Sequence, residues 1–275
     1  MPPDFLAIGV VTRDISPEGY SVGGAVTYGA LTAMRLGLAP AVVTSAASDL
    51  DLESAMEGVP RHVVSSRTTT SFENVYDGGS RRQRIVEVAD PIAAADLPLE
   101  WRNAPLVLLG PLVGELRDDL ARSFRNSSVM ASMQGWLRQW DDEGFVTPAA
   151  WDGREVLPHV GAAICSVEDF EDEGLIDVWK EMVPVLIVTM GKGGARLHYS
   201  GTWHLIEPFE AQEVDPTGAG DVFATAYLVR YRETSDVLES ARFASCVASF
   251  CVEAEGTKGI PTRSQVEERL GSMGR

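Results

Sequence analysis

The chain has 275 residues, of which 45% are hydrophobic and 23% charged, and its 40 acids outnumber 23 lysines and arginines to give a formal net charge of −17. This is the composition of an ordinary globular protein, long enough to bury a sizeable core without disulfides. The acidic balance argues against a general nucleic-acid binder, because contact with a polyanion needs a basic face.

The first third of the chain alternates strand and helix patterns and then changes character. Two short apolar runs, at residues 5–11 and 39–45, predict buried strands on either side of a helical stretch at residues 25–36. Residues 61–88 are rich in Thr, Val, Ser and Arg, with a turn signal at residues 77–79. This pattern predicts a β-hairpin, which we expect to form a small sheet apart from the main body.

From residue 104 onward, apolar runs alternate with helical segments. Strands are predicted at residues 105–109, 128–133, 183–190, 195–199 and 202–208. Helices are predicted at residues 115–124, 167–180, 218–231 and 237–254. Buried strands that alternate with helices predict one α/β domain over residues 1–275, a three-layer αβα arrangement around a mainly parallel central sheet.

Cysteine usage and apolar segments bear on the compartment. Cys165, Cys246 and Cys251 form no CxxC pair and are expected to be reduced core thiols. The N-terminus shows neither the basic nor the long apolar segment of a signal peptide. The longest apolar stretches, at residues 105–114 and 183–190, are too short to span a bilayer. We therefore expect a cytoplasmic protein without a membrane partner.

A glycine-rich segment near the C-terminus carries the chemistry. Gly218, Ala219 and Gly220 open a predicted helix, and Asp221 falls in its first turn. Such a helix start presents free N–H groups and the positive end of the dipole to an anion, which here would be a phosphoryl group. A carboxylate beside it could accept a proton from a substrate hydroxyl. The alternative is a glycine-rich turn whose acid only complements the helix dipole.

The complete string Asp215-Pro-Thr-Gly-Ala-Gly-Asp221 resembles the C-terminal signature of the ribokinase-like carbohydrate kinases, also called the PfkB family. Gly23-Gly24 resemble the family's N-terminal double glycine, and residues 188–195 resemble its strand and glycine loop beside the nucleotide. The resemblance covers nearly the whole chain. It implies a ribokinase-like fold with a small β-sheet lid, formed by about residues 12–24 and 61–88.

The resemblance also implies in-line phosphoryl transfer from ATP, with Mg²⁺, to a hydroxyl of a small polyol. Asp221 would deprotonate that hydroxyl, while the N–H groups of Gly218, Ala219 and Gly220 would hold the charge that develops on the transferred group. The residues that it places at the nucleotide are Thr189, Gly191, Lys192, Gly194, Thr217 and Gly256. Family members often respond to K⁺, and the resemblance would place that ion at the edge of residues 215–217.

Acceptor binding is assigned to five residues. The resemblance gives this role to Asp14, Gly23 and Gly24. Gln134 and Arg138 are added by position, because residues just past the carboxyl end of a strand line the crevice of a doubly wound sheet. The alternative for these two is a capping glutamine and a surface arginine.

The metal segment departs from the family. Where members commonly carry Asn-x-x-Glu to organise Mg²⁺ and phosphates through water, this chain reads Ser166-Val-Glu-Asp169. Glu168 and Asp169 keep oxygen ligands, so Mg²⁺ held indirectly remains the expectation. A serine N-cap with acids in the first helical turn explains the same residues equally well.

Three further strings narrow the expected acceptor. Residues 11–15, 68–74 and 134–138 resemble the myo-inositol kinase branch, so myo-inositol or a related cyclitol or sugar is expected. The alternatives are a nucleoside kinase and a non-catalytic nucleotide-binding relative, the latter because of the change at Ser166. A lid sheet with one open face often pairs with its copy, which would make a homodimer.

Overall fold

The computed structural model describes residues 2–77 and 80–272, and among these nine strands form a central sheet in the order β15-β14-β13-β12-β9-β8-β1-β4-β5. The strands are β1 (Phe5–Ile8), β4 (Pro40–Ala46), β5 (Arg61–Ser65), β8 (Leu106–Leu109), β9 (Ser128–Ser132), β12 (Ala162–Ser166), β13 (Val185–Thr189), β14 (Ala195–Tyr199) and β15 (Thr202–Ile206). Neighbouring strands run parallel from β13 to β5, whereas β14 and β15 are antiparallel. The predicted mainly parallel sheet is confirmed.

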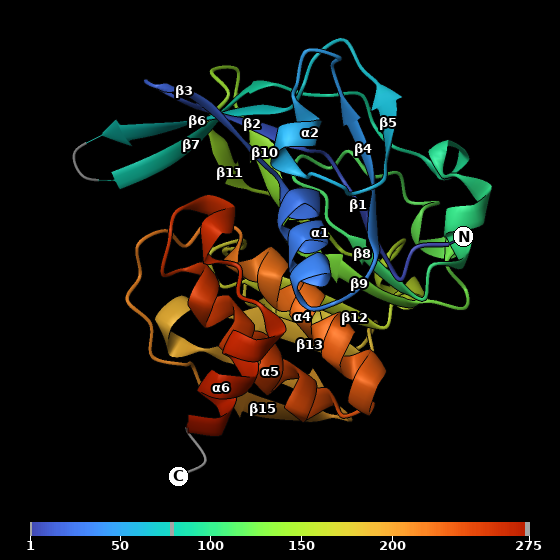
Figure 1. The fold of residues 1–275 in the computed structure, drawn as a ribbon, viewed down its shortest axis with the longest axis vertical. Helices are drawn as coiled ribbons and strands as arrows, with labels where there is room; N and C mark the ends of the chain where they lie inside the picture. The colour runs from blue at the N-terminus through green and yellow to red at the C-terminus, as the bar shows by residue number, and fades with distance from the viewer. Residues whose placement is uncertain (1, 78–79, 273–275) are drawn as a thin grey trace.

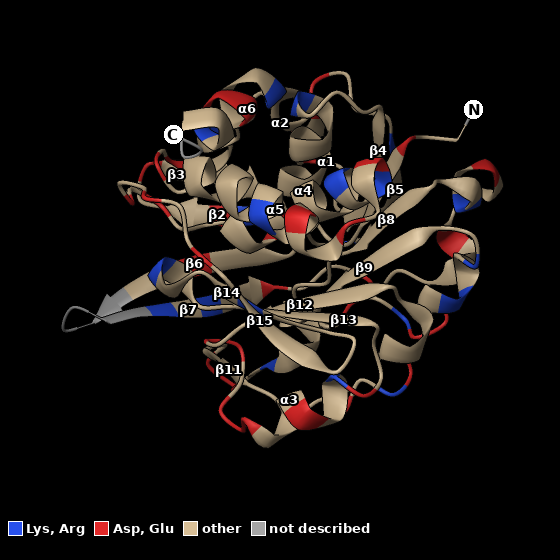
Figure 2. Ribbon diagram, turned by 90° about the horizontal axis from the view of Figure 1, so that it is seen from below, with Lys and Arg blue, Asp and Glu red and all other residues tan. Residues whose placement is uncertain are grey.

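Helices cover both faces of this sheet (Figure 2). One face carries α1 (Ala25–Arg35), α4 (Ala219–Thr234), α5 (Val237–Cys251) and α6 (Arg263–Ser272); the other carries α3 (Gly174–Trp179), and α2 (Leu52–Ala55) is a single turn after β4. Along β1, Phe5 and Ala7 pack with the α4–α5 core, and Leu6 and Ile8 pack with the core around α3. Burial on both faces explains why the strands read as unbroken apolar runs. None of the helices in the described residues is long and apolar enough to cross a membrane.

A second sheet stands apart from the first and forms the lid (Figure 1). Its strands are β2 (Thr12–Ser16), β3 (Gly19–Gly23), β6 (Ser71–Asp77) and β7 (Ser80–Glu87), in the order β3-β2-β6-β7. The predicted hairpin at residues 61–88 therefore began too early: β5 is an edge strand of the central sheet, with Arg61 beside Val42 of β4. The turn predicted at residues 77–79 falls on Gly78 and Gly79, which lie outside the described residues.

Two helix predictions fail for the same kind of reason. Residues 115–124 form no α-helix, because the carboxylate of Glu115 turns inward and accepts hydrogen bonds from the backbone N–H groups of Val10, Leu112 and Val113. Of the helix expected at residues 167–180, only the part that forms α3 is present. In the turn before it, the side chains of Asp169 and Ser166 accept hydrogen bonds from the backbone N–H groups of Ser166 and Glu168. In both places, a carboxylate accepts hydrogen bonds from backbone N–H groups, and these bonds take the place of a regular helix.

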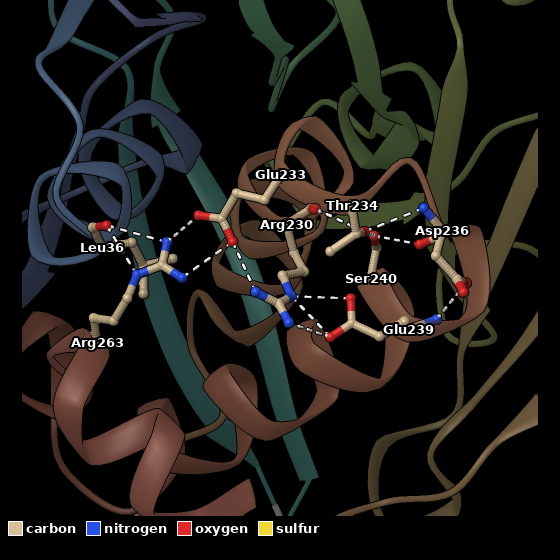
Figure 3. A network of polar contacts seen from close by, with 8 residues as sticks. All are labelled: Leu36, Arg230, Glu233, Thr234, Asp236, Glu239, Ser240 and Arg263. Atoms are coloured by element: carbon tan, nitrogen blue, oxygen red, sulfur yellow. Dashed lines mark hydrogen bonds and ion pairs between the residues drawn. The ribbon is translucent and has the colours of Figure 1, made fainter.

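A polar network fixes the C-terminal helices to α1 (Figure 3). Arg263, at the start of α6, donates to the Leu36 carbonyl just past α1 and to Glu233 of α4. Arg230 donates to the same Glu233 at 2.9 Å and to Glu239 of α5 at 2.8 Å. The network therefore joins the carboxyl ends of α1 and α4, whose opposite ends begin at the glycine-rich segments singled out in the sequence.

The structure also has a small sheet that the sequence pattern does not reveal. Strands β10 (Arg138–Trp140) and β11 (Val146–Pro148) pair antiparallel, and Gly144 beside them accepts a bond from the backbone N–H of Ile85 in the lid. Arg138, assigned to acceptor binding, is the first residue of β10. The pair therefore links the base of the lid to a predicted site residue.

Candidate active site

A cavity of about 1070 Å³ lies at the carboxyl edge of the parallel strands. Ser132, Ser166 and Thr189, the last residues of β9, β12 and β13, all line it. The lid contributes Thr12, Asp14, Phe72 and Gln83. The chain passes from β1 to β4 and β5 on one side and then to β8 and β9 on the other, and the reversal beside β1 is where such sheets bind ligands.

Asp221 sits in the first turn of α4 and lines this cavity. Burial raises the pKa of Asp221 to about 7, and the negative charge of Asp169 also raises it, whereas Arg138 and a hydrogen bond from Ser132 lower it. A carboxylate that is half-ionised near neutral pH suits a general base. The structure thus places Asp221 and Arg138 in the same site and adds Ser132, which the sequence reading missed.

The glycine turn before α4, predicted to bind an anion, lines the cavity. Gly218 is the N-cap with φ of 77°, a left-handed conformation that favours glycine. The Ala219 amide donates to the carbonyl of Pro216 at 3.3 Å, so the amides of Gly218 and Gly220 are the better placed donors to a bound anion. The expectation that the amides of Gly218, Ala219 and Gly220 hold the charge of a transferred group stays a prediction.

At the acceptor end, Asp14 of β2 faces Gly23 of β3. A Cβ added to Gly23 would lie 2.3 Å from Oδ2 of Asp14 and 2.8 Å from Oγ1 of Thr12. Gly23 does not itself line the cavity but leaves room for the Asp14 carboxylate, whereas Gly24 lines it directly. The absence of a side chain at Gly23 therefore leaves the space that the Asp14 carboxylate occupies.

The other end of the cavity extends beyond the glycine loops toward α5. The predicted nucleotide residues Thr189, Gly191, Lys192, Gly194 and Thr217 all line it, together with residues 208–213 and Ser245, Ala248, Ser249, Val252 and Glu253. The ammonium of Lys192 is 80% exposed and lies 3.6 Å from Glu213. Gly256, also predicted at the nucleotide, does not line the cavity. Its N–H donates to Oδ2 of Asp215 at 2.9 Å, so Gly256 contacts the loop before α4 from outside the cavity.

Residues 166–169 form a compact turn and not the start of a helix, since α3 begins at Gly174 with Glu173 as its N-cap. The N-cap alternative is therefore wrong, and the Mg²⁺ role stays a prediction. Oδ2 of Asp169 accepts from the Ser166 N–H at 2.7 Å, and Oγ of Ser166 accepts from the Glu168 N–H at 3.2 Å. Oδ1 of Asp169 also accepts from Gln134 at 3.2 Å, so this glutamine orients an acid. Glu168 and Asp169 both line the cavity and offer the oxygen ligands that Mg²⁺ takes. In the described residues, no group of three or more His, Cys, Asp or Glu side chains is placed to hold a metal.

Known proteins resemble this chain in sequence and in fold. The family model described as pfkB family carbohydrate kinase matches residues 160–263, which include the metal turn, the glycine loop and the start of α4. Over this segment the chain matches the PfkB family of carbohydrate kinases. This confirms the ribokinase-like resemblance that the Asp215–Asp221 string carried.

Curated kinases from other organisms resemble parts of the chain, one of them over most of its length. An inositol 3-kinase from Oryza sativa subsp. japonica is 30% identical over 247 residues, which are 81% of this chain and 61% of that protein. A nucleoside kinase from Methanothermobacter thermautotrophicus is 39% identical over 109 residues, 39% of this chain and 34% of that one. The chain thus spans less than two thirds of the length of these relatives.

Solved structures of family members share the fold. A pyrophosphate-dependent kinase in the ribokinase family, complexed with a pyrophosphate analog and myo-inositol, has a TM-score of 0.79 at 22% identity and covers 96% of this chain and 99% of its own. Arabidopsis thaliana ribokinase, complexed with ribose and ATP, has a TM-score of 0.76 at 22% identity, with 98% and 99% covered. At this identity the likeness establishes the three-layer fold with its lid.

Proposed function

We propose that this chain is a PfkB family member and an ATP-dependent kinase that phosphorylates a hydroxyl of a small uncharged polyol, with myo-inositol or a related cyclitol as the first candidate. The observation that carries the proposal is Asp221, a carboxylate with a pKa of about 7 in the first turn of α4, inside a cavity with polar groups at both ends. The inositol 3-kinase relatives support the cyclitol.

The proposed step is an in-line displacement. The acceptor oxygen forms a bond to the γ-phosphorus of ATP as Asp221 takes its proton, and the bond from that phosphorus to the bridging oxygen breaks, so ADP leaves with the electron pair. The amides of Gly218 and Gly220 stabilise charge that develops on the transferred group. Mg²⁺, held through water by Glu168 or Asp169, would neutralise phosphate charge. The lid excludes water and so limits ATP hydrolysis.

The length of the cavity favours a nucleotide over pyrophosphate as donor. Structures of similar fold include a pyrophosphate-dependent kinase. Pyrophosphate is much smaller than ATP, because it has no ribose and no base. Here the cavity continues past Thr217 to Ser245 on α5 and to Val252 just after that helix. We assign this extra length to the ribose and base, because ligand sites bury most of the surface of what they bind.

A matrix of donors and acceptors tests the proposal. ATP and pyrophosphate are each combined with myo-inositol, ribose, fructose and a nucleoside, and phosphorylated product is measured directly. We expect turnover with ATP and myo-inositol. Turnover with the nucleoside alone would replace the proposal by a nucleoside kinase, which the relative from Methanothermobacter makes the second candidate. ATP binding without turnover on any acceptor would indicate a non-catalytic relative.

Asp14→Ala is expected to raise the acceptor KM by roughly 10–100-fold, since a hydrogen bond to a charged group contributes about 1.5–3 kcal/mol. The KM of ATP should stay nearly unchanged, because the glycine loops lie at the other end of the cavity. Steady-state kinetics and the melting temperature measure this, with Asp49→Ala, the exposed partner of Arg13, as control. An unchanged acceptor KM in folded Asp14→Ala would move the acceptor site elsewhere.

Glu168→Ala is expected to raise the Mg²⁺ concentration needed for half-maximal rate several-fold, with kcat at saturating Mg²⁺ little changed. The reason is that both oxygens of Asp169 already accept hydrogen bonds, one from the Gln134 side chain and one from the Ser166 N–H, so Glu168 is the acid better able to bind metal-held water. Mg²⁺ titration of the rate measures this, with Glu171→Ala on the same acidic segment as control. If Asp169→Ala shifts the curve and Glu168→Ala does not, the roles are reversed.

The rate should rise with pH through about 7, because Asp221 accepts a proton only in its ionised form and its pKa is raised to that value. Removing the positive charge in Arg138→Gln raises the pKa of Asp221 further, so the rising limb should move to higher pH. The pH dependence of kcat/KM for the acceptor reports this. A profile that is flat across neutral pH, or a shift to lower pH in Arg138→Gln, would contradict the assignment.

A further inference from the structure

Tyr28 is a buried aromatic residue beside the site that no sequence motif singles out. It lies in the first turn of α1, where its backbone N–H donates to the carbonyl of Gly24 at 3.3 Å. The side chain is only 4% exposed and yet lines the cavity. The next residue, Gly29, packs so closely that a Cβ there would lie 2.9 Å from Leu108 and 3.2 Å from Thr225 of α4. The close approach of α1 to α4 brings Tyr28 to the start of α4.

The ring of Tyr28 fills the space directly against Gly218. A Cβ added to Gly218 would lie 2.2 Å from Cδ1, 2.3 Å from Cε1 and 2.5 Å from Cγ of Tyr28. A flat ring in that place leaves no room for a side chain, and the φ of 77° at Gly218 also favours glycine. The left-handed N-cap and the ring therefore fit each other as a pair.

The far end of the same ring reaches the loop that holds this turn. A Cβ on Gly256 would lie 3.9 Å from the Tyr28 hydroxyl. Asp215 joins the two sides, because its carboxylate accepts from the Gly256 N–H at 2.9 Å and from the Thr217 N–H at 3.0 Å. Burial above all raises the pKa of Tyr28, so the phenol is neutral. The ring thus spans the base of the turn from Gly218 to Gly256.

We propose that Tyr28 is a positioning residue for phosphoryl transfer, whose ring fixes Gly218 and thereby aims the amides of Gly218 and Gly220 at the transferred group. This inference rests on the proposed kinase function. Those amides act on charge that develops in the transition state, so the effect falls on kcat and not on KM. A displacement of about 1 Å in such a group costs on the order of 10²-fold in rate.

Three variants test this role. Tyr28→Leu removes the ring, Tyr28→Phe keeps it, and Tyr227→Leu removes another buried tyrosine, 2% exposed, from α4 outside the cavity. We expect Tyr28→Leu to lower kcat by about 10–100-fold with the KM of acceptor and ATP nearly unchanged. Tyr28→Phe should restore kcat to near the wild-type value. Tyr227→Leu should lower the melting temperature without lowering kcat.

Each other outcome has a definite meaning. A wild-type kcat in folded Tyr28→Leu overturns the proposal, and so does an equal loss in Tyr28→Phe, which would make the hydroxyl and not the ring the active part. An equal kcat loss in Tyr227→Leu would show a general effect of destabilisation. If Tyr28→Leu does not fold, Tyr28→Met fills the space with a flexible chain and takes its place. Absence of turnover in the wild-type protein would instead contradict the proposed function itself.

Discussion

Asp221→Asn is expected to lower kcat by about 10²–10⁴-fold while ATP binding stays largely intact. The amide is nearly the same size as the carboxylate and can still accept the hydrogen bond from Ser132, but it cannot take a proton from the acceptor. The change also removes the group whose ionisation sets the pH dependence. Rapid-quench or coupled measurement of kcat, with calorimetric binding of MgATP, separates the two effects.

Asp236→Asn is the matched control for this change. Asp236 caps the neighbouring helix α5, where its Oδ1 accepts from the N–H groups of Leu238 and Glu239 at 3.0 Å. Asparagine is as good an N-cap as aspartate, so this variant should keep full activity. If Asp221→Asn retains nearly full kcat, Asp221 is not the base, and the acid nearest to it, Asp169, becomes the candidate.

The glycine-rich motifs could be predicted because each depends on residues that are adjacent in sequence. Gly218 and Asp221 are three positions apart, so the turn, the helix start and the acid in its first turn follow from local geometry alone. The buried strands could be predicted for a similar reason, since β1 is apolar at every position. The place of Asp14 after the first strand followed from the general rule for doubly wound sheets.

What the sequence did not reveal depends on contacts between distant residues. Glu115 accepts a hydrogen bond from the backbone N–H of Val10, which is 105 positions away in the sequence. Nothing in the local pattern distinguishes this glutamate from one in a helix. Tyr28 has the spacing of an ordinary core residue of α1. Its proposed positioning role depends on contact with Gly218, which is 190 positions further along the chain. Ser132 could have been found, because it ends a predicted strand at the edge where ligands bind.

The limits of the lid could not be set by composition. Arg61–Ser65 and Ser71–Asp77 are both short segments that mix polar and apolar residues, and the difference lies in the partner strand. The first pairs with β4 of the central sheet and the second with β2 of the lid. Strand partners are a property of the whole fold, so local alternation predicts a strand without predicting its sheet.

Gly218→Ala is expected to lower kcat by about 10²–10³-fold, the loss found when a donor to a developing anion is removed. Two effects act together. The new Cβ would enter the ring of Tyr28, at 2.2 Å from Cδ1, and the φ of 77° is unfavourable for alanine by roughly 1–2 kcal/mol. The turn must shift to relieve both, and the amides of Gly218 and Gly220 shift with it.

Gly201→Ala separates the two effects. Gly201 has nearly the same φ, 76°, in the turn between β14 and β15, but a Cβ there meets no atom within 4 Å. Both variants therefore have an alanine at an unfavourable φ, and this should lower the melting temperature of both. Only Gly218→Ala has a steric conflict in addition, and only this variant should lose kcat. Combining Gly218→Ala with Tyr28→Leu removes the steric conflict while leaving the φ unchanged, so part of the stability should return. Full kcat in the single Gly218→Ala variant would mean that the turn tolerates the Cβ without moving, and the amides before Asp221 would then not be the group that holds the transferred phosphoryl.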